Sequence, residues 1–465
     1  MSSPSLLQGN SLAARDVRSM IHPYTNLSTH LTEGPLIIQR GKGVHVYDEE
    51  GREYIEGLAG LWCASFGFGE EELIKAATEQ MRKLPFYHSF ASKSTEPSIL
   101  LAEKLLEVAP MPFSKVFFAN SGSEANDTVI KLVWYYNNSR GQPAKKKIIS
   151  RQKAYHGVTV AAASLTGLPP LHNDFDLPIK NILHTSCPHY YRYGKDGETE
   201  EEFAARCAAE LEQLILAEGP ETVAAFIAEP IMGAGGVIIP PATYFGKMQA
   251  VLKKYDVLMV ADEVICGFGR TGEMWGSEAL GIRPDIVTCA KALSSAYLPI
   301  SAVMITEEIF QGMVKQSEKH GALAHGFTYS GHPVPAAVGL RTLQLMEERD
   351  LLAHVRKVSV RFNERFQALG DHPLVGEVRS MGLIGAVELV ADKKTKRPFD
   401  ASRKAAPKAS AAMQEAGVIS RAVAGDNLAL CPPLIITEAE IDTMFDRFTQ
   451  GLDVVAAAAK AENWD

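Results

Sequence analysis

Short apolar runs alternate with amphipathic stretches through the middle of the chain, between residues 70 and 335. Such runs, separated by helical patterns, predict strands joined by helices and hence a largely parallel α/β sheet. The runs are VFFA at 116–119, KIIS at 147–150, VAAFIAE at 223–229, VLMVAD at 257–262, DIVTCA at 285–290 and ISAVMIT at 300–306. Ligands of such sheets bind beyond the carboxyl ends of the strands. The residues that end or follow these runs therefore become site candidates, namely Asn120, Glu229, Asp262 and Lys291.

The two ends of the chain carry other patterns. VHVYDEEGREYIEGLAG, at 44–60, alternates around the turn-like DEEG and predicts a hairpin. Residues 339–369 have helical periodicity, and LIGAVELV at 383–390 is typical of a strand. The final VVAAAAKAEN, at 454–463, predicts a terminal helix.

Length and composition indicate a globular enzyme of two or three domains, because the chain has 465 residues and is 46% hydrophobic and 22% charged. The formal net charge is −8, and a basic run such as AKKK at 144–147 is short. A negatively charged protein repels a polyphosphate backbone, so we expect no nucleic-acid partner.

The number and spacing of the cysteines, together with the hydropathy of the chain, favour a cytoplasmic location for the protein. The six cysteines are scattered and include no CxxC pair, which indicates reduced thiols. The first twenty residues lack the apolar segment of a secretory signal, and no run of eighteen apolar residues occurs. We therefore expect a soluble cytoplasmic protein with no membrane partner.

The segment FFANSGSEANDTVIKLVWYY, at 117–136, passes from a strand through small residues into a helix. Ser121, Gly122 and Ser123 would then offer free backbone N–H groups at a helix N-terminus, where an anion such as phosphate binds. The alternative is an ordinary helix cap, with serine at the cap and Glu124 in the first turn.

Asp262 and Lys291 suggest an enzyme that uses pyridoxal 5'-phosphate. A carboxylate at the end of an apolar strand needs a cationic partner, which a protonated pyridine nitrogen would supply. A structural salt bridge or a metal ligand is the alternative for Asp262. The amine of Lys291 could form a Schiff base with an aldehyde and then carry a proton, whereas a surface lysine is the alternative.

Two further motifs carry weaker signals. Tyr155, in RQKAYHGVTVAAAS, could stack on a flat heterocycle, although a core tyrosine and a structural His156 are the default interpretation. GFGRTG at 267–272 spells the dinucleotide fingerprint, but DEVIC separates it from the strand and no helical pattern opens at its third glycine. A nicotinamide dehydrogenase is therefore disfavoured.

Taken in order, NSGSEAND, AYHG, AEPIMGAGG, ADEVICGFGRTG, the Lys291 segment and HGFTYSGHP resemble the class III aminotransferases, from about Leu36 to Leu452. More narrowly, the chain resembles pyruvate-dependent ω-transaminases. The resemblance implies the pyridoxal-phosphate transferase fold type I, an α/β fold with a large cofactor-binding domain of mostly parallel sheet at 70–335. Residues 1–69 and 336–465 would jointly form a small α+β domain.

The resemblance also implies roles for individual residues. Ser121, Gly122 and Ser123 would hold the cofactor phosphate. The residues implied around the cofactor ring are Tyr155 on one face, Val264 on the other, Asp262 at the ring nitrogen, Lys291 at the aldehyde and Glu229 in the network near Asp262. Thr328 would reach the phosphate in the neighbouring subunit, so a homodimer with shared sites is implied and a tetramer stays open.

Substrate selection would involve apolar wall residues and one arginine, namely Trp62, Phe90, Val158, Ala234, Tyr24 and Arg421. Arg421 would clamp a substrate carboxylate with its guanidinium. No metal site is expected.

The implied reaction is a ping-pong transamination from an amine or ω-amino acid to pyruvate, which yields an aldehyde or ketone and alanine. Decarboxylase or aminomutase chemistry on the same scaffold is one alternative. A catalytically silent pyridoxal-phosphate-binding protein is another. The amine donor, the enantiopreference and the choice between dimer and tetramer are left open.

Overall fold

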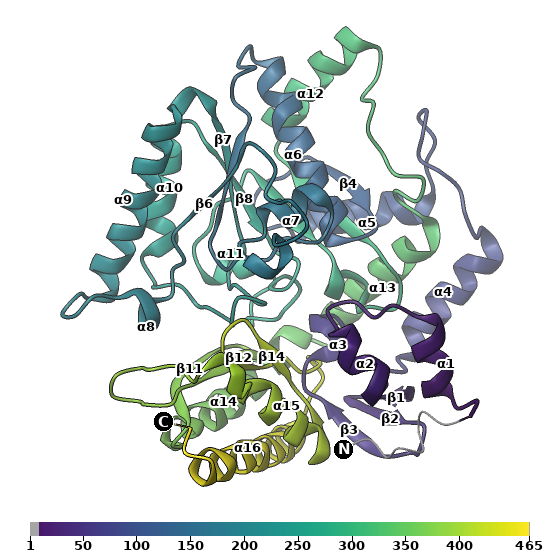
Figure 1. Cartoon of the computed structure of the whole chain (residues 1–465). Helices are drawn as coiled ribbons and strands as arrows, with labels where there is room; N and C mark the ends of the chain where they lie inside the picture. The colour runs from purple at the N-terminus through teal and green to yellow at the C-terminus, as the bar shows by residue number, and fades with distance from the viewer. Residues whose placement is uncertain (1–8, 465) are drawn as a thin grey trace.

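A seven-stranded sheet forms the centre of the computed structural model, which describes residues 9–464 (Figure 1). Its strands, in spatial order, are β4 (Lys115–Ala119), β10 (Ser301–Ile305), β9 (Ile286–Cys289), β8 (Leu258–Asp262), β7 (Val223–Ala228), β5 (Lys147–Arg151) and β6 (Ile182–Thr185). Only β10 runs antiparallel to its neighbours. The six predicted strands and the largely parallel α/β sheet are confirmed, while β6 was not predicted.

Helices cover both faces of this sheet. One face packs against α6 (Gly122–Ser139), α7 (Val160–Leu165) and α12 (Glu307–His320). The other packs against α9 (Glu200–Glu218), α10 (Tyr244–Lys254) and α13 (Pro333–Glu348). Alternate residues of each strand enter the two apolar cores, which explains why these strands read as continuous apolar runs.

The ends of the chain meet in a second sheet of four strands. It consists of β1 (Ile38–Lys42), β2 (His45–Asp48), β3 (Glu53–Glu56) and β13 (Val418–Ile419). The predicted hairpin is confirmed as the antiparallel pair β2–β3, and β13 lies parallel to β3 with Val418 opposite Ile55. The helices near this end are α1 (Leu12–Ser19), α2 (Leu27–Glu33) and α3 (Ala59–Trp62), whereas α4 (Glu71–Lys83) and α5 (Glu96–Glu107) pack against α13.

A third, antiparallel sheet belongs to the C-terminal part, drawn in green to yellow below the central sheet in Figure 1. Its order is β11 (Val375–Met381), β12 (Ile384–Leu389), β15 (Asn427–Leu430) and β14 (Arg421–Val423). The helices are α14 (Leu351–Ala368), α15 (Ala405–Glu415) and α16 (Glu438–Ala461). The predicted helical stretch is confirmed as α13 and α14, LIGAVELV as β12, and the terminal helix as the end of α16.

The segment that contains GFGRTG forms turns from residue 264 to 274, and no helix begins at Gly272. This geometry does not fit a dinucleotide fingerprint. Within residues 9–464, no helix has both the length and the apolar character needed to cross a bilayer. The domain boundaries after residues 69 and 335 stay predictions.

Candidate active site

One cavity of about 300 Å³ lies at the carboxyl ends of the central strands. Pockets that hold cofactors and small ligands begin at about this size. Eight residues that the sequence suggested for a cofactor line it, namely Ser121, Gly122, Ser123, Tyr155, Glu229, Asp262, Val264 and Lys291. The fold therefore brings five separate chain segments to one edge of the sheet, as expected for parallel strands.

Asp262 is the last residue of β8 and is buried. Its Oδ2 accepts hydrogen bonds from Asn126 Nδ2 and His156 Nδ1, both at 2.8 Å. Its Oδ1 accepts a hydrogen bond from the backbone N–H of Val264 at 3.1 Å. These donors hold the carboxylate in one orientation at the cavity wall, where it can accept a hydrogen bond from a cationic ligand nitrogen.

Lys291 follows β9 and begins a short 3₁₀ helix, η3 (Lys291–Ser294). Its φ of +45° lies in the left-handed region, which a lysine rarely adopts. The side chain lines the cavity. Strained backbone of this kind gathers at functional sites, where the surrounding structure holds it in place.

The N-terminus of α6 combines both interpretations of its sequence. Ser121 caps the helix, because its Oγ accepts from the N–H of Glu124 at 3.2 Å. Ser123 Oγ accepts from the N–H of Val158 at 3.0 Å. The first N–H groups of a helix, here those of Gly122 and Ser123, have no partner within it, and the helix dipole favours an anion there.

Gly157 allows the Tyr155 loop to approach this helix. Its φ is +135°, and a Cβ at this position would lie 2.4 Å from Ser123 Oγ. Any larger residue would push Ser123 away from the cavity.

Glu229 lies fully buried after β7, and burial raises its pKa. Its Oε1 accepts from the backbone N–H of Tyr155 and its Oε2 from that of Gly233, both at 3.0 Å. Glu229 therefore ties the Tyr155 loop to the loop that follows β7.

Two more predicted residues flank Tyr155. The Tyr24 hydroxyl donates to the Tyr155 hydroxyl at 3.2 Å. Burial raises the pKa of Tyr155, the hydrogen bond with Tyr24 raises it further, and the positive charge of Arg421 opposes both. Tyr24 and Arg421 thus lie near the cavity without lining it.

The segment that carries Tyr24 is held by a polar cluster. Asp16 Oδ1 accepts from His22 Nε2 at 2.8 Å and from His30 Nε2 at 3.2 Å. These contacts join α1 to α2 across the residues between them, and so fix the approach of Tyr24 to the site.

The remaining predicted residues do not line this cavity. Trp62 is buried in an apolar cluster that includes Ile265, which does line the cavity. The carbonyl of Ala234 accepts from the N–H of Ala424 at 3.3 Å. Val158 lines a neighbouring hollow of about 760 Å³ together with Tyr24.

Phe90 and Thr328 are exposed, and the structure brings their segments together. A Cβ at Gly326 would lie 3.3 Å from Phe90 Cζ, so Phe90 sits beside the segment that leads to Thr328. Neither residue lines the cavity of its own chain.

Several residues of the site were not predicted from the sequence. Asn126 and His156 both bond to Asp262, and Cys63 lines the cavity. His156, expected to be a structural histidine, instead positions Asp262. The only available signals were local, since Asn126 lies one helical turn after Gly122 and His156 adjoins Tyr155.

The donor set suits pyridoxal 5'-phosphate. The N-terminus of α6 suits its phosphate, Asp262 its ring nitrogen, Lys291 its aldehyde, and Tyr155 with Val264 its two ring faces. Among the described residues, His156 Nε2 and Asn126 Oδ1 are buried without a hydrogen-bond partner, as is common beside a ligand or water site.

Comparisons with known proteins agree with this assignment. A family model described as Aminotransferase class-III matches residues 28–452. Gamma aminobutyrate transaminase 1, mitochondrial, of Solanum lycopersicum is 52% identical over 434 residues, which are 93% of this chain and 84% of that protein. The solved ω-transaminase from Pseudomonas jessenii in complex with PMP is 55% identical, with a TM-score of 0.95, and the match covers 96% of this chain and 99% of that one. A structure described as a transaminase with L-ala is 57% identical, with a TM-score of 0.90 and coverage of 91% and 100%.

Proposed function

Because the chain belongs to the class III aminotransferases, we propose that it moves an amino group from an amine or ω-amino acid to pyruvate. It is a pyridoxal-phosphate-dependent aminotransferase of fold type I. The observation that carries the proposal is the single cavity lined by Lys291, Asp262 and the N-terminus of α6.

When bound, pyridoxal phosphate supplies an aldehyde that carries the amino group and a ring that takes up electrons from the substrate carbon. Lys291 is the residue that would hold that aldehyde through its Nζ, and its amine, once released, would be the base that moves a proton at the substrate carbon. Asp262 would accept a hydrogen bond from the protonated ring nitrogen and so keep the ring cationic. Asn126 and His156 orient Asp262 by their hydrogen bonds.

Arg421 is the proposed carboxylate clamp for pyruvate and alanine. It begins β14, is half-buried, and acts electrostatically on Tyr155 beside the cavity. A guanidinium binds a carboxylate through two parallel hydrogen bonds. In the other half-reaction, the predicted wall residues Trp62, Phe90, Val158 and Ala234 would accept the apolar part of an amine.

A homodimer is proposed as the working form. Phe90 and Thr328 are exposed in the single chain, and their segments lie together away from its own cavity. This arrangement supports a role for both in the site of a second subunit, with Thr328 at the cofactor phosphate.

The cytoplasm is the proposed location. All six cysteines are unpaired, which suits a reducing compartment. The tomato relative carries a mitochondrial name, so fractionation of the source cells, with a matrix marker as the comparison, tests the location. Recovery in the matrix fraction would contradict it.

A donor panel tests the function. The purified enzyme is loaded with pyridoxal phosphate and given pyruvate with γ-aminobutyrate, β-alanine, taurine, putrescine or 1-phenylethylamine, and alanine is quantified. Because the tomato relative is named for γ-aminobutyrate, that donor is tried first. We expect one alanine per donor consumed, and no alanine with any donor would overturn pyruvate as the acceptor. Carbon dioxide release or isomerisation of the donor in place of alanine would instead favour decarboxylase or aminomutase chemistry.

A further inference from the structure

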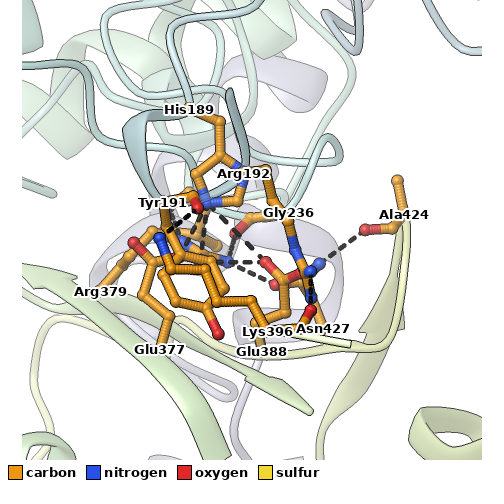
Figure 2. Close-up of polar contacts among 11 residues, drawn as sticks. His189, Tyr191, Arg192, Gly236, Glu377, Arg379, Glu388, Lys396, Ala424 and Asn427 are labelled. Carbon is orange, nitrogen blue, oxygen red and sulfur yellow. Dashed lines mark hydrogen bonds and ion pairs between the residues drawn. The ribbon is translucent and has the colours of Figure 1, made fainter. Parts of the chain in front are cut away.

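A buried polar cluster joins the C-terminal sheet to the loop that follows β7 (Figure 2). Its centre is Arg379 on β11, which is only 6% exposed. Figure 2 shows the side chains of His189, Glu377, Glu388 and Asn427 gathered around this arginine. None of these residues has a role in the reaction described above.

The Arg379 guanidinium holds the loop after β7 by its backbone. Nε donates to the carbonyl of Val237 at 3.2 Å, and Nη2 donates to the carbonyl of Gly236 at 2.7 Å. Nη2 also donates to Asn427 Oδ1 on β15. One planar group therefore fixes the loop relative to the C-terminal sheet.

Two carboxylates compensate the buried charge of Arg379. Nη1 donates to Glu377 Oε2 and lies 3.4 Å from Glu388 Oε2. Although burial opposes it, the hydrogen bond from His189 and the charge of Arg379 hold the pKa of Glu377 below its ordinary value. A buried guanidinium that is paired in this way is costly to remove, because its partners would be left unpaired.

The same cluster has the ligand spacing of a metal site, since His189, Glu377 and Glu388 place three ligand atoms within 4.8 Å of one another. Arg379 Nη1 lies 3.2 Å from His189 Nε2 and bonds to Glu377. The positive charge of the guanidinium therefore occupies the place that a metal ion would take, and we assign the cluster a positioning role.

The network continues from Arg379 to the predicted substrate residues. Asn427 Nδ2 donates to the carbonyl of Ala424 at 2.7 Å, and the N–H of Ala424 donates to the carbonyl of Ala234 at 3.3 Å. Ala424 lies in the turn between β15 and β14, the strand that begins at Arg421. The path from Arg379 thus reaches both Ala234 and the hairpin of Arg421.

Gly236 gives separate support for this close fit. Its φ is +127°, and a Cβ there would lie 3.1 Å from Asn427 Nδ2. The loop therefore approaches Asn427 more closely than a larger residue allows.

We propose that Arg379 is a positioning residue for carboxylate recognition. It holds the loop after β7, which carries Ala234, at a fixed position relative to the β14–β15 hairpin, which carries Arg421. The proposal rests on the function proposed above. A substrate with a carboxylate is bound at two points, the cofactor and Arg421, so it depends on the distance between them. An amine without a carboxylate has no such requirement. Small displacements of a positioning group lower reactivity strongly, so the loss of Arg379 should affect acids more than bare amines.

The test compares Arg379→Gln and Arg379→Lys with wild-type holoenzyme. The acid substrate is whichever of pyruvate, glyoxylate and 2-oxoglutarate the wild type uses best, and the amine is 1-phenylethylamine. For Arg379→Gln, kcat/KM for the acid should fall roughly tenfold, mainly because KM rises. For the amine, kcat/KM should fall less than threefold. Arg379→Lys should give an intermediate loss. Calorimetry with propionate, a carboxylate that cannot react, should show a similar loss of affinity.

Matched variants separate positioning from simple destabilisation. Arg365→Gln removes a charge that pairs with Asp442 and Asp446, between α14 and α16. It should leave the acid-to-amine ratio unchanged even if the melting temperature falls. Asn427→Ala cuts the link to Ala424 and should change the acid-to-amine ratio of kcat/KM in the same direction as Arg379→Gln. If Arg379→Gln does not fold, Asn427→Ala takes its place in the test. In an Arg421→Ala background, Arg379→Gln should have no acid-specific effect.

Equal losses for acid and amine in both Arg379→Gln and Asn427→Ala would overturn the positioning role. Failure of wild-type enzyme to use pyruvate, while another 2-oxo acid reacts, would overturn only the proposed acceptor. The ratio test then proceeds with that acid.

Discussion

At the scale of single residues, Asp262 is the clearest test of the cofactor assignment. Asp262→Asn keeps an acceptor oxygen for the neighbouring donors but loses the charge that pairs with a cationic ring nitrogen. We expect kcat to fall on the order of 10²- to 10³-fold, the usual loss for one well-placed electrostatic group. Steady-state alanine formation measures it.

A matched control is Asp285→Asn. Asp285 is half-buried at the amino end of β9, and its Oδ2 accepts from the N–H of Met259 at 2.8 Å. The control should retain activity within about threefold, because it lies at the opposite edge of the sheet from the cavity. A similar loss in both variants would point to destabilisation and count against the role of Asp262.

Gly157→Ala tests the phosphate site. A methyl group would lie 2.4 Å from Ser123 Oγ, and the φ of +135° already disfavours any side chain. Strain of about 1–3 kcal/mol should weaken pyridoxal phosphate binding by roughly tenfold or more. Fluorescence titration of the apoenzyme measures this affinity, with Gly246→Ala, where a Cβ meets no atom within 4 Å, as the control. Unchanged affinity in Gly157→Ala would contradict the assignment.

Sequence reasoning identified the residues that lie within strong motifs, such as Lys291 and Asp262, because each follows or ends a predicted strand. It could not assign His156 or Asn126 to the site. Their importance comes from hydrogen bonds to Asp262, 106 and 136 positions away. Nor could it predict the left-handed backbone of Lys291, which tertiary packing imposes.

At the scale of elements, Glu56 links pH to stability. It ends β3, is 7% exposed, and its Oε1 accepts from the N–H of Leu58 at 2.9 Å. Burial raises the pKa of Glu56 from 4.5 to about 7. Its contribution to stability is therefore complete below about pH 4.5 and is lost as the pH rises through about 7.

Glu56→Gln should remove this pH dependence. A shift of this size corresponds to roughly 3 kcal/mol, or about 3 °C in the melting temperature of a chain this long. Between pH 5 and pH 8 the melting temperature of the wild type should fall by about that many degrees relative to the variant, as followed by differential scanning calorimetry. Parallel curves for the two proteins would contradict the account.

The strands of the central sheet were predictable because both of their faces are apolar. β6 was not, because ILHT is short and half polar. The two-residue β13 gave no signal of its own, yet it pairs with β3 and joins the chain ends. That pairing depends on contacts over more than 360 positions, which no local pattern encodes.

At the scale of the whole molecule, the exposed Thr328 tests the shared site. If it reaches the phosphate in a second subunit, Thr328→Val should weaken cofactor binding at least about tenfold, since a hydrogen bond to a charged group contributes about 1.5–3 kcal/mol. Thr443→Val, on the exposed face of α16, is the matched control. Analytical ultracentrifugation should give a dimer or a multiple of it. A monomeric active enzyme would contradict the proposal.

The central claim is that one cavity carries both half-reactions and that Arg421 serves only the acid. Rapid mixing of holoenzyme with 1-phenylethylamine, and then with pyruvate, measures each half-reaction in a single turnover by absorbance. In wild type the cofactor band should bleach with the amine and return with pyruvate, and one alanine should form per site. In Arg421→Ala the bleaching rate should change less than threefold while the return slows by roughly tenfold or more, as expected when a charge-assisted bond is lost. Equal slowing of both steps, or no bleaching in wild type, would contradict the account.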